Sequence, residues 1–165
     1  MLAVRSGAVA GLAGTLALAS AAVLRNRLLG RAPPYAAHTL ATRLAARLGW
    51  KLSSHGAYVA GGLMRLGYGT GLGLLFTRLG GRWAVHSPTV AGGLLGAAVL
   101  LFEHLTFPWL GVTPPASRWT PGERALLVAQ TSLYGLVTTR VYRLSAKRRR
   151  TPSAGTAPSA AARAT

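Results

Sequence analysis

Four apolar runs, each long enough to cross a lipid bilayer as an α-helix, constrain this 165-residue chain more than any other feature. A helix rises about 1.5 Å per residue, so about 20 apolar residues span a hydrocarbon core about 30 Å thick. The first run contains no charged residue, and charged residues are rare inside the other three. The runs are residues 7–24, 57–77, 89–110 and 124–142. We therefore predict an all-α integral membrane protein with four transmembrane helices.

The composition favours the same class of protein. Half of the residues are apolar and only 13% are charged, compared with about a quarter in soluble domains. The net charge of +17 could indicate nucleic-acid binding. However, the arginines lie mostly between the runs and in the tail, as they do at the ends of membrane spans. We therefore expect the lipid bilayer as the partner, with anionic lipids at the basic connector and the tail, and no nucleic acid. With no Cys in the chain, disulfides, thiolate metal ligands and a cysteine nucleophile are excluded.

The domain organisation follows from these runs. Residues 1–144 are expected to form a single four-helix membrane domain. Residues 145–165 are small, polar and basic, and are predicted to be a disordered tail. The first run could instead be a signal peptide, because an Arg precedes it and Ala-Ser-Ala lies near its end. Its length and its glycines favour a retained span.

A short amphipathic helix is predicted over about residues 35–50, between the first and second spans. Its apolar and basic stripes consist of Leu40, Leu44, Leu48, Arg43, Arg47 and Lys51. This pattern is typical of a helix that lies on the membrane surface, with Trp50 at the level of the headgroups. A target helix for a calmodulin-like protein or for nucleic acid is the alternative.

Glycines spaced four residues apart predict close helix contacts, because small residues let two backbones approach. The stretch GYGTGLG also resembles a nucleotide-binding loop. That interpretation is rejected because no strand precedes the stretch and no acidic residue follows about 20 positions later. We predict helix packing at Gly7, Gly11, Gly67, Gly69, Gly71, Gly73, Gly92 and Gly96.

One of the two acidic residues of the chain, Glu103, lies inside the third run. Counted at about 1.5 Å per residue, Glu103 and Arg65 both lie roughly 10 to 12 Å inside the membrane from the same side, and Gln130 lies at a similar depth. A charge at this depth costs a few kcal/mol or more unless it is paired or hydrated, and arginine matches a carboxylate in a two-pronged geometry. We predict a polar cluster of Arg65, Glu103, His104 and Gln130.

Two roles remain open for this cluster. It could be an architectural ion pair that fixes helix packing, or a polar site on a substrate, ion or proton path. A haem or metal site at His55 and His104 is a weaker alternative, because only one carboxylate is near and the other histidines lie in separate connectors. We therefore expect no metal and no cofactor. No Gly-x-Ser-x-Gly motif and no Asp is present, so no catalytic residue and no enzymatic activity are predicted.

A faint internal repeat is visible. VAGL at 9–12 matches VAGG at 90–93, and residues 66–76 match residues 132–142, with one Tyr-Gly pair over another. A true repeat would give two parallel helix hairpins. The alternative is a chance match between segments rich in Gly and Ala.

Three stretches, SSHGAYVAGGLMRLGYGTGLGLLF, LLFEHLTFPWLGVTPP and LVAQTSLYGLVTTRVYRL, resemble the YagU-like family of small bacterial inner-membrane proteins. The matching positions are His55, Tyr68-Gly69, Pro108, Leu110-Gly111 and Tyr134-Gly135. The resemblance covers roughly residues 50 to 144. It implies a multi-pass protein of the bacterial cytoplasmic (inner) membrane. The family has no established activity, so the resemblance implies no catalytic residue.

The orientation is nearly balanced, with nine Lys and Arg residues on one side of four spans and eight on the other. We expect both termini in the cytoplasm, because the run KRRR directly follows the last span. The leading hypothesis is a structural or partner-binding membrane subunit that can form homo-oligomers. The alternative is a small oligomeric transporter or channel with the Arg-Glu-His cluster on its path.

Overall fold

The computed structural model describes residues 2–29 and 36–148, and every regular element in these two ranges is helical. The all-α prediction is therefore confirmed. The four long helices are α1 (Leu2–Leu29), α3 (Ser54–Leu79), α5 (Pro88–Trp109) and α6 (Pro121–Arg148). The short elements are α2 (Ala37–Arg47), α4 (Gly81–His86) and the 3-10 turn η1 (Ala116–Arg118).

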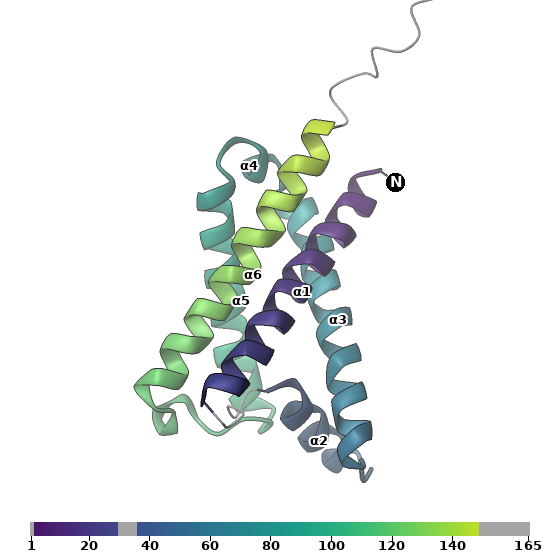
Figure 1. Cartoon of the computed structure of the whole chain (residues 1–165), viewed down its shortest axis with the longest axis vertical. Helices are drawn as coiled ribbons and strands as arrows, with labels where there is room; N and C mark the ends of the chain where they lie inside the picture. The colour runs from purple at the N-terminus through teal and green to yellow at the C-terminus, as the bar shows by residue number, and fades with distance from the viewer. Residues whose placement is uncertain (1, 30–35, 149–165) are drawn as a thin grey trace, which may run out of the picture.

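The long helices form a bundle in which consecutive helices run in alternating directions (Figure 1). Helix α1 packs against both α3 and α6, and α5 packs along α6. Helix α2 packs against α3 at one end of the bundle, near the connection between α5 and α6. Helix α4 lies at the other end, together with the first turns of α1 and the last turns of α6.

Two of these helices are long and apolar enough to cross a membrane by themselves: residues Val4–Leu24 within α1, and Pro88–Trp109, which is α5. Four such helices were predicted. Helices α3 and α6 have the required length, with 26 and 28 residues, but they contain more polar residues.

Several boundaries differ from the prediction. Helix α6 continues to Arg148, so residues 145–148, which were predicted to be disordered, are helical. The reason is that no Gly or Pro follows Tyr142 until Pro152, and Lys and Arg are good helix formers. Residues 149–165 of the predicted tail lie outside the described residues. The amphipathic helix is shorter than predicted, because Gly49 ends it with φ of +78°.

Local signals in the sequence explain where the helices begin and end. Helix α6 begins with a capping box, in which Thr120 N–H donates to Glu123 Oε2 at 2.9 Å and Glu123 N–H donates to Thr120 Oγ1 at 3.3 Å. Helix α5 ends at Trp109, and Gly111, two residues later, has a φ of +63°. The N–H of Val112 then donates to the carbonyl of Phe107 at 3.0 Å, which is a Schellman motif. The second carboxylate of the chain, Glu123, thus has a capping role.

Glycines allow the closest helix contacts. A Cβ atom on Gly73 would lie 2.6 Å from the Cα of Gly11, and a Cβ atom on Gly96 would lie 2.7 Å from the carbonyl oxygen of Thr131. The predicted packing glycines that lie at such contacts are Gly7, Gly11, Gly69, Gly73, Gly92 and Gly96. They join α1 to α3 and α5 to α6.

Gly67 and Gly71 differ from the prediction. A Cβ atom at either position would meet nothing within 4 Å, so neither glycine packs against another of the described helices. Two residues correspond to about 200° of rotation around a helix. The stripe containing Gly67 and Gly71 therefore faces outward when Gly69 and Gly73 contact α1.

The internal repeat is visible in the contacts. The matching segments make Gly11 equivalent to Gly92, and Gly69 equivalent to Gly135. A Cβ atom on Gly11 would lie 2.6 Å from the carbonyl oxygen of Gly69, and a Cβ atom on Gly135 would overlap the carbonyl oxygen of Gly92. Equivalent positions thus make equivalent contacts in the hairpin α1–α3 and in the hairpin α5–α6. Tyr134 joins the two hairpins, because its hydroxyl donates to the carbonyl of Gly69 at 2.6 Å.

The repeat is broken at one interface. Helices α1 and α6 pack closely, whereas in the described residues the equivalent pair, α5 and α3, makes few backbone contacts. At the close interface, a Cβ atom on Gly14 would overlap the hydroxyl of Thr138. The equivalent positions are occupied by Leu95 and Leu72. Two leucines need more space than Gly and Thr, so α5 and α3 stay apart.

Candidate functional site: a polar cavity between the helices

A cavity of about 200 Å³ lies between the four long helices, closer to the α2 end of the bundle. Helix α2 and the turn after α5 close this end through Leu40, Leu44, Leu110 and Val112. Most of the lining is apolar. The polar side chains on the lining are Thr15, Arg65, Tyr68, Glu103, Gln130, Thr131 and Tyr134.

Helical spacing brings these polar residues to the cavity. Arg65 and Tyr68 are three residues apart on α3, and Gln130 and Tyr134 are four residues apart on α6, so each pair shares one helix face. Glu103 is the lining residue of α5 at this level. Three helices therefore each contribute a polar face to the same space.

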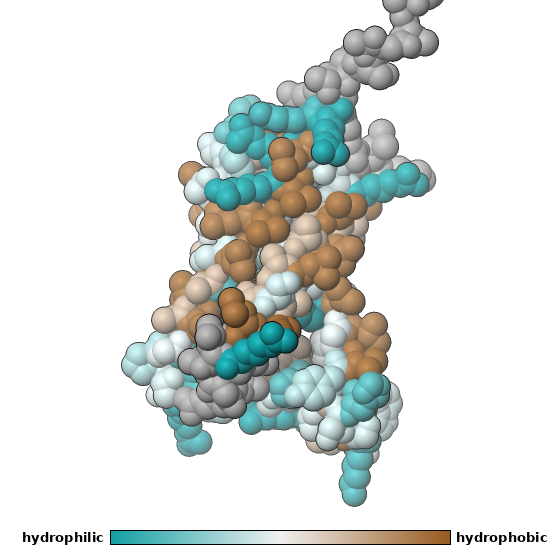
Figure 2. Space-filling view, viewed as in Figure 1, coloured by the Kyte–Doolittle hydropathy of each residue, from teal (hydrophilic) through white to brown (hydrophobic). Residues whose placement is uncertain are grey.

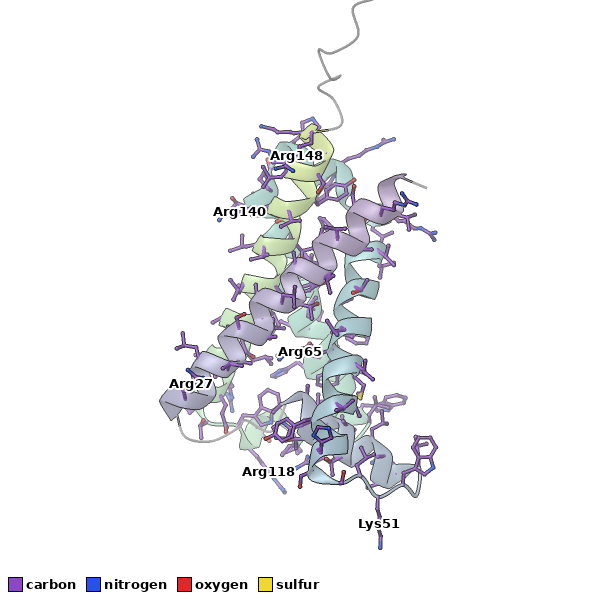
Figure 3. The ribbon with its side chains drawn as sticks, turned by 45° about the vertical axis from the view of Figure 1, so that its right-hand side comes forward. Arg27, Lys51, Arg65, Arg118, Arg140 and Arg148 are labelled. Carbon is purple, nitrogen blue, oxygen red and sulfur yellow. The ribbon has the colours of Figure 1, made fainter. Side chains whose placement is uncertain are left out.

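Three of the four residues in the predicted cluster meet at this cavity: Arg65, Glu103 and Gln130. Arg65 lies close enough to Glu103 to interact with it electrostatically. Both side chains are half-buried, and Gln130 is only 7% exposed. Figure 3 shows Arg65 within the bundle, away from both ends. The other cations labelled there lie toward the two ends of the molecule: Arg27, Lys51, Arg118, Arg140 and Arg148.

His104 does not line the cavity. Its ring packs edge-on against Trp119, with 5.4 Å between the ring centroids. Its Nδ1 atom is buried and has no hydrogen-bond partner within the described ranges. Adjacent residues differ by about 100° around a helix, so Glu103 and His104 cannot both point into the same space. The cluster is therefore Arg65, Glu103 and Gln130 without His104.

Two tyrosines complete the polar lining, and the sequence analysis noted them only as parts of Tyr-Gly motifs. The Tyr68 hydroxyl interacts electrostatically with Glu103 and with Tyr134. It is buried, and none of the residues that the structure describes forms a hydrogen bond with it. The sequence does hold a signal for both tyrosines. Tyr68 lies three residues after Arg65 and Tyr134 four residues after Gln130, so each shares a helix face with a residue of the predicted cluster.

Helix α2 is attached to the turn that closes the cavity. The Arg43 guanidinium donates from Nη1 to the carbonyl of Val112 at 2.9 Å, and the Arg47 guanidinium lies against Gly111. On its other side, α2 packs on α3, where a Cβ atom on Gly61 would lie 2.7 Å from backbone atoms of Ala37 and of the next residue. The two arginines, which belong to the basic stripe of the predicted amphipathic helix, thus contact the chain itself.

Several kinds of polar group border the same cavity. They include a guanidinium, a carboxylate, an amide and a hydroxyl around a space large enough for a small molecule. Within residues 2–29 and 36–148, no group of three or more His, Asp or Glu residues could hold a metal ion. His55 is exposed at the first turn of α3, on a different helix from His104.

No family model, no curated protein and no solved structure matches the chain. The resemblance to the YagU-like family therefore rests on the sequence motifs. In the structure these motifs lie at helix contacts and helix ends. Gly69 is packed against the Thr15 side chain and Gly135 against the backbone of α5. Tyr134 joins α6 to α3, and Gly111 follows the end of α5.

Proposed function

We propose that the chain is a four-span protein of the bacterial cytoplasmic membrane, with α1, α3, α5 and α6 crossing the bilayer and α2 lying at one membrane face. At about 1.5 Å per residue, each of these helices is longer than the hydrocarbon core, which is about 30 Å thick. In this arrangement the start of α1, the end of α6 and α4 lie on one side, expected to be the cytoplasm.

The distribution of polarity carries this proposal, because several polar side chains are buried inside the bundle while many large apolar side chains are exposed. The most deeply buried side chains include Thr15, Thr138 and Thr139. On the face seen in Figure 2, apolar residues form a belt across the middle of the molecule, with hydrophilic residues toward both ends. Soluble monomers rarely expose large contiguous apolar patches. The belt comes from all four long helices: Val9, Leu12, Leu16, Leu63, Leu66, Leu75, Leu94, Leu101, Leu105 and Val128.

The same distribution explains the low hydropathy of α3 and α6. Arg65 of α3 lines the internal cavity, and the polar residues Gln130, Thr131 and Thr139 of α6 are buried. A helix whose polar residues face protein meets the bilayer only with its apolar face. Both helices can therefore cross the membrane although their mean hydropathy is modest.

For the activity, we propose a small transporter or channel that binds a small polar or charged solute between Arg65, Glu103 and Gln130. The observation that supports it is the cavity between the helices. Ionisable residues inside a membrane are costly, and they mark ion and substrate paths. A purely architectural ion pair needs no space beside it, whereas these groups border a cavity of about 200 Å³. The buried Tyr68 hydroxyl, which has no partner among the described residues, offers a further donor to a bound solute.

The second candidate is a structural or partner-binding subunit. The observation that favours it is the outward face of α3, where Gly62, Gly67 and Gly71 have open space beside them. Small residues on a lipid-facing surface allow a helix of another chain, or of a second copy, to approach closely.

Ion flux into liposomes separates these two candidates. Purified protein is reconstituted, and the movement of protons, sodium, potassium and chloride is followed with entrapped dyes. The transporter proposal expects flux above that of empty liposomes, which falls in Glu103→Gln. Glu123→Gln is the matched control, because it removes the same charge while a glutamine preserves the capping box. Correctly inserted protein without flux of any of these ions supports the structural subunit instead.

A further inference from the structure

A second, larger cavity opens between α3, α4 and α5, with a volume of about 550 Å³. It is the space left where Leu72 and Leu95 hold α3 and α5 apart, and both leucines line it. Almost all of its lining is aliphatic or aromatic. We propose that this groove holds one acyl chain of an anionic phospholipid, whose headgroup is bound at the α4 end. This inference rests on the proposed membrane location.

The length of the groove fits one leaflet of a bilayer. On α3 it extends from Leu79 to Tyr68, and on α5 from Ala91 to Phe102. Eleven residues of helix correspond to about 16 Å, and half of a hydrocarbon core is about 15 Å. At the inner end, the rings of Tyr68 and Phe102 stack across the groove, with 6.0 Å between their centroids. A chain that enters at the α4 end therefore meets the end of the groove near the middle of the bilayer.

The α4 end has the features of a headgroup site. Trp83 of α4 lines the groove and is 66% exposed, as is typical of a tryptophan at a membrane interface. Arg78 and Arg82 are exposed and adjoin the lining residues Leu79 and Trp83 in the sequence. Both arginines are therefore close to the end of the groove.

Charge complementarity selects an anionic lipid over a neutral one. The last turns of α6, which lie at the same end of the bundle (Figure 1), add Arg143, Lys147 and Arg148. The two acidic side chains of the chain lie elsewhere: Glu103 at the internal cavity and Glu123 at the start of α6. Each arginine on a surface next to lipid should favour an anionic headgroup over a neutral one about fivefold.

Quenching of Trp83 fluorescence by brominated lipid tests this proposal. Trp83 emission is obtained as the difference between the wild-type protein and Trp83→Phe, both reconstituted in phosphatidylcholine vesicles. A small mole fraction of brominated phosphatidylglycerol or of brominated phosphatidylcholine is then added. We expect phosphatidylglycerol to quench Trp83 at a mole fraction several-fold lower than phosphatidylcholine requires.

Matched variants separate the groove from its charged end. Ala98→Phe fills the groove and should remove the preference for phosphatidylglycerol, whereas Ala97→Phe, the exposed neighbour outside the lining, should keep it. Replacing Arg78 and Arg82 with glutamine should reduce the preference about fivefold for each arginine, whereas Arg118→Gln at the opposite end of the bundle should leave it unchanged.

The lipid site and the membrane location can be refuted separately. The lipid site would be overturned if the two lipids quenched the wild-type protein equally. It would also be overturned if the preference for phosphatidylglycerol were unchanged in both Ala98→Phe and the double arginine variant. Vesicles made entirely of brominated phosphatidylcholine test the membrane location separately. If the total tryptophan emission is not quenched there, the protein does not enter the bilayer, and the four-span proposal fails. Normal quenching there without a preference for phosphatidylglycerol refutes only the lipid site.

Discussion

Replacing Gly92 with alanine should loosen the contact between α5 and α6, whereas the same change at the adjacent Gly93 should not. A Cβ atom at position 92 would lie 2.9 Å from the Cα of Leu136 and 3.1 Å from the carbonyl carbon of Gly135. Both are backbone atoms of α6, so no side-chain rotation can relieve the overlap, and the two helices must separate. A Cβ atom at position 93 would meet nothing within 4 Å.

The magnitudes predict that Gly92→Ala alone destabilises the protein. Overpacking of this kind costs about 1 to 3 kcal/mol, and a Gly→Ala change inside a helix gains at most about 1 kcal/mol. Gly92→Ala should therefore lower the free energy of unfolding by about 1 to 2 kcal/mol, and Gly93→Ala should raise it slightly or leave it unchanged. Unfolding in mixed detergent micelles, followed by far-UV circular dichroism, measures both. Equal stability of the two variants would refute the close approach of α5 and α6.

Two further predictions concern the cavity. Arg65→Gln and Glu103→Gln should each destabilise the protein in detergent. The double variant should recover part of the loss, with a coupling free energy of about 1 to 2 kcal/mol. Strictly additive effects would show that the two side chains act independently. Arg43→Ala removes the hydrogen bond to Val112 and should speed hydrogen exchange of the α2 amides about fivefold to tenfold, as loss of about 1 kcal/mol implies, while amides in α6 exchange as before. Unchanged exchange in α2 would contradict its attachment through this hydrogen bond.

The helices and the level of the polar residues along the bundle could be predicted from the sequence, because both follow from distances along one helix. The positions of Arg65, Glu103 and Gln130 relative to the ends of their runs were enough to predict that they lie at one level. The direction in which each residue points was harder to predict. Two glycine stripes on α3 have the same spacing, namely Gly67 with Gly71 and Gly69 with Gly73. Only the contact of the second stripe with α1 distinguishes them. His104 was included in the cluster for the same reason, since depth alone does not separate it from its neighbour.

The two cavities depend on contacts between helices that are far apart in the sequence. The repeat alone would predict that α5 packs against α3 as closely as α1 packs against α6. The substitution of Leu95 and Leu72 for the small pair Gly14 and Thr138 prevents this packing. That difference is present in the sequence, but it has meaning only when the two positions are known to face each other.

The central claim is that the chain crosses one membrane four times. Mapping which side of the membrane each connection lies on tests this claim most directly. The protein has no cysteine, so single cysteines can be introduced into the otherwise wild-type chain at Lys51, Ser87, Ser117 and Lys147. They are labelled with a membrane-impermeant maleimide, in sealed cells and after permeabilisation. Four spans predict that cysteines at 51 and 117 react from one side of the membrane and cysteines at 87 and 147 from the other. Labelling of all four from the same side would contradict the account.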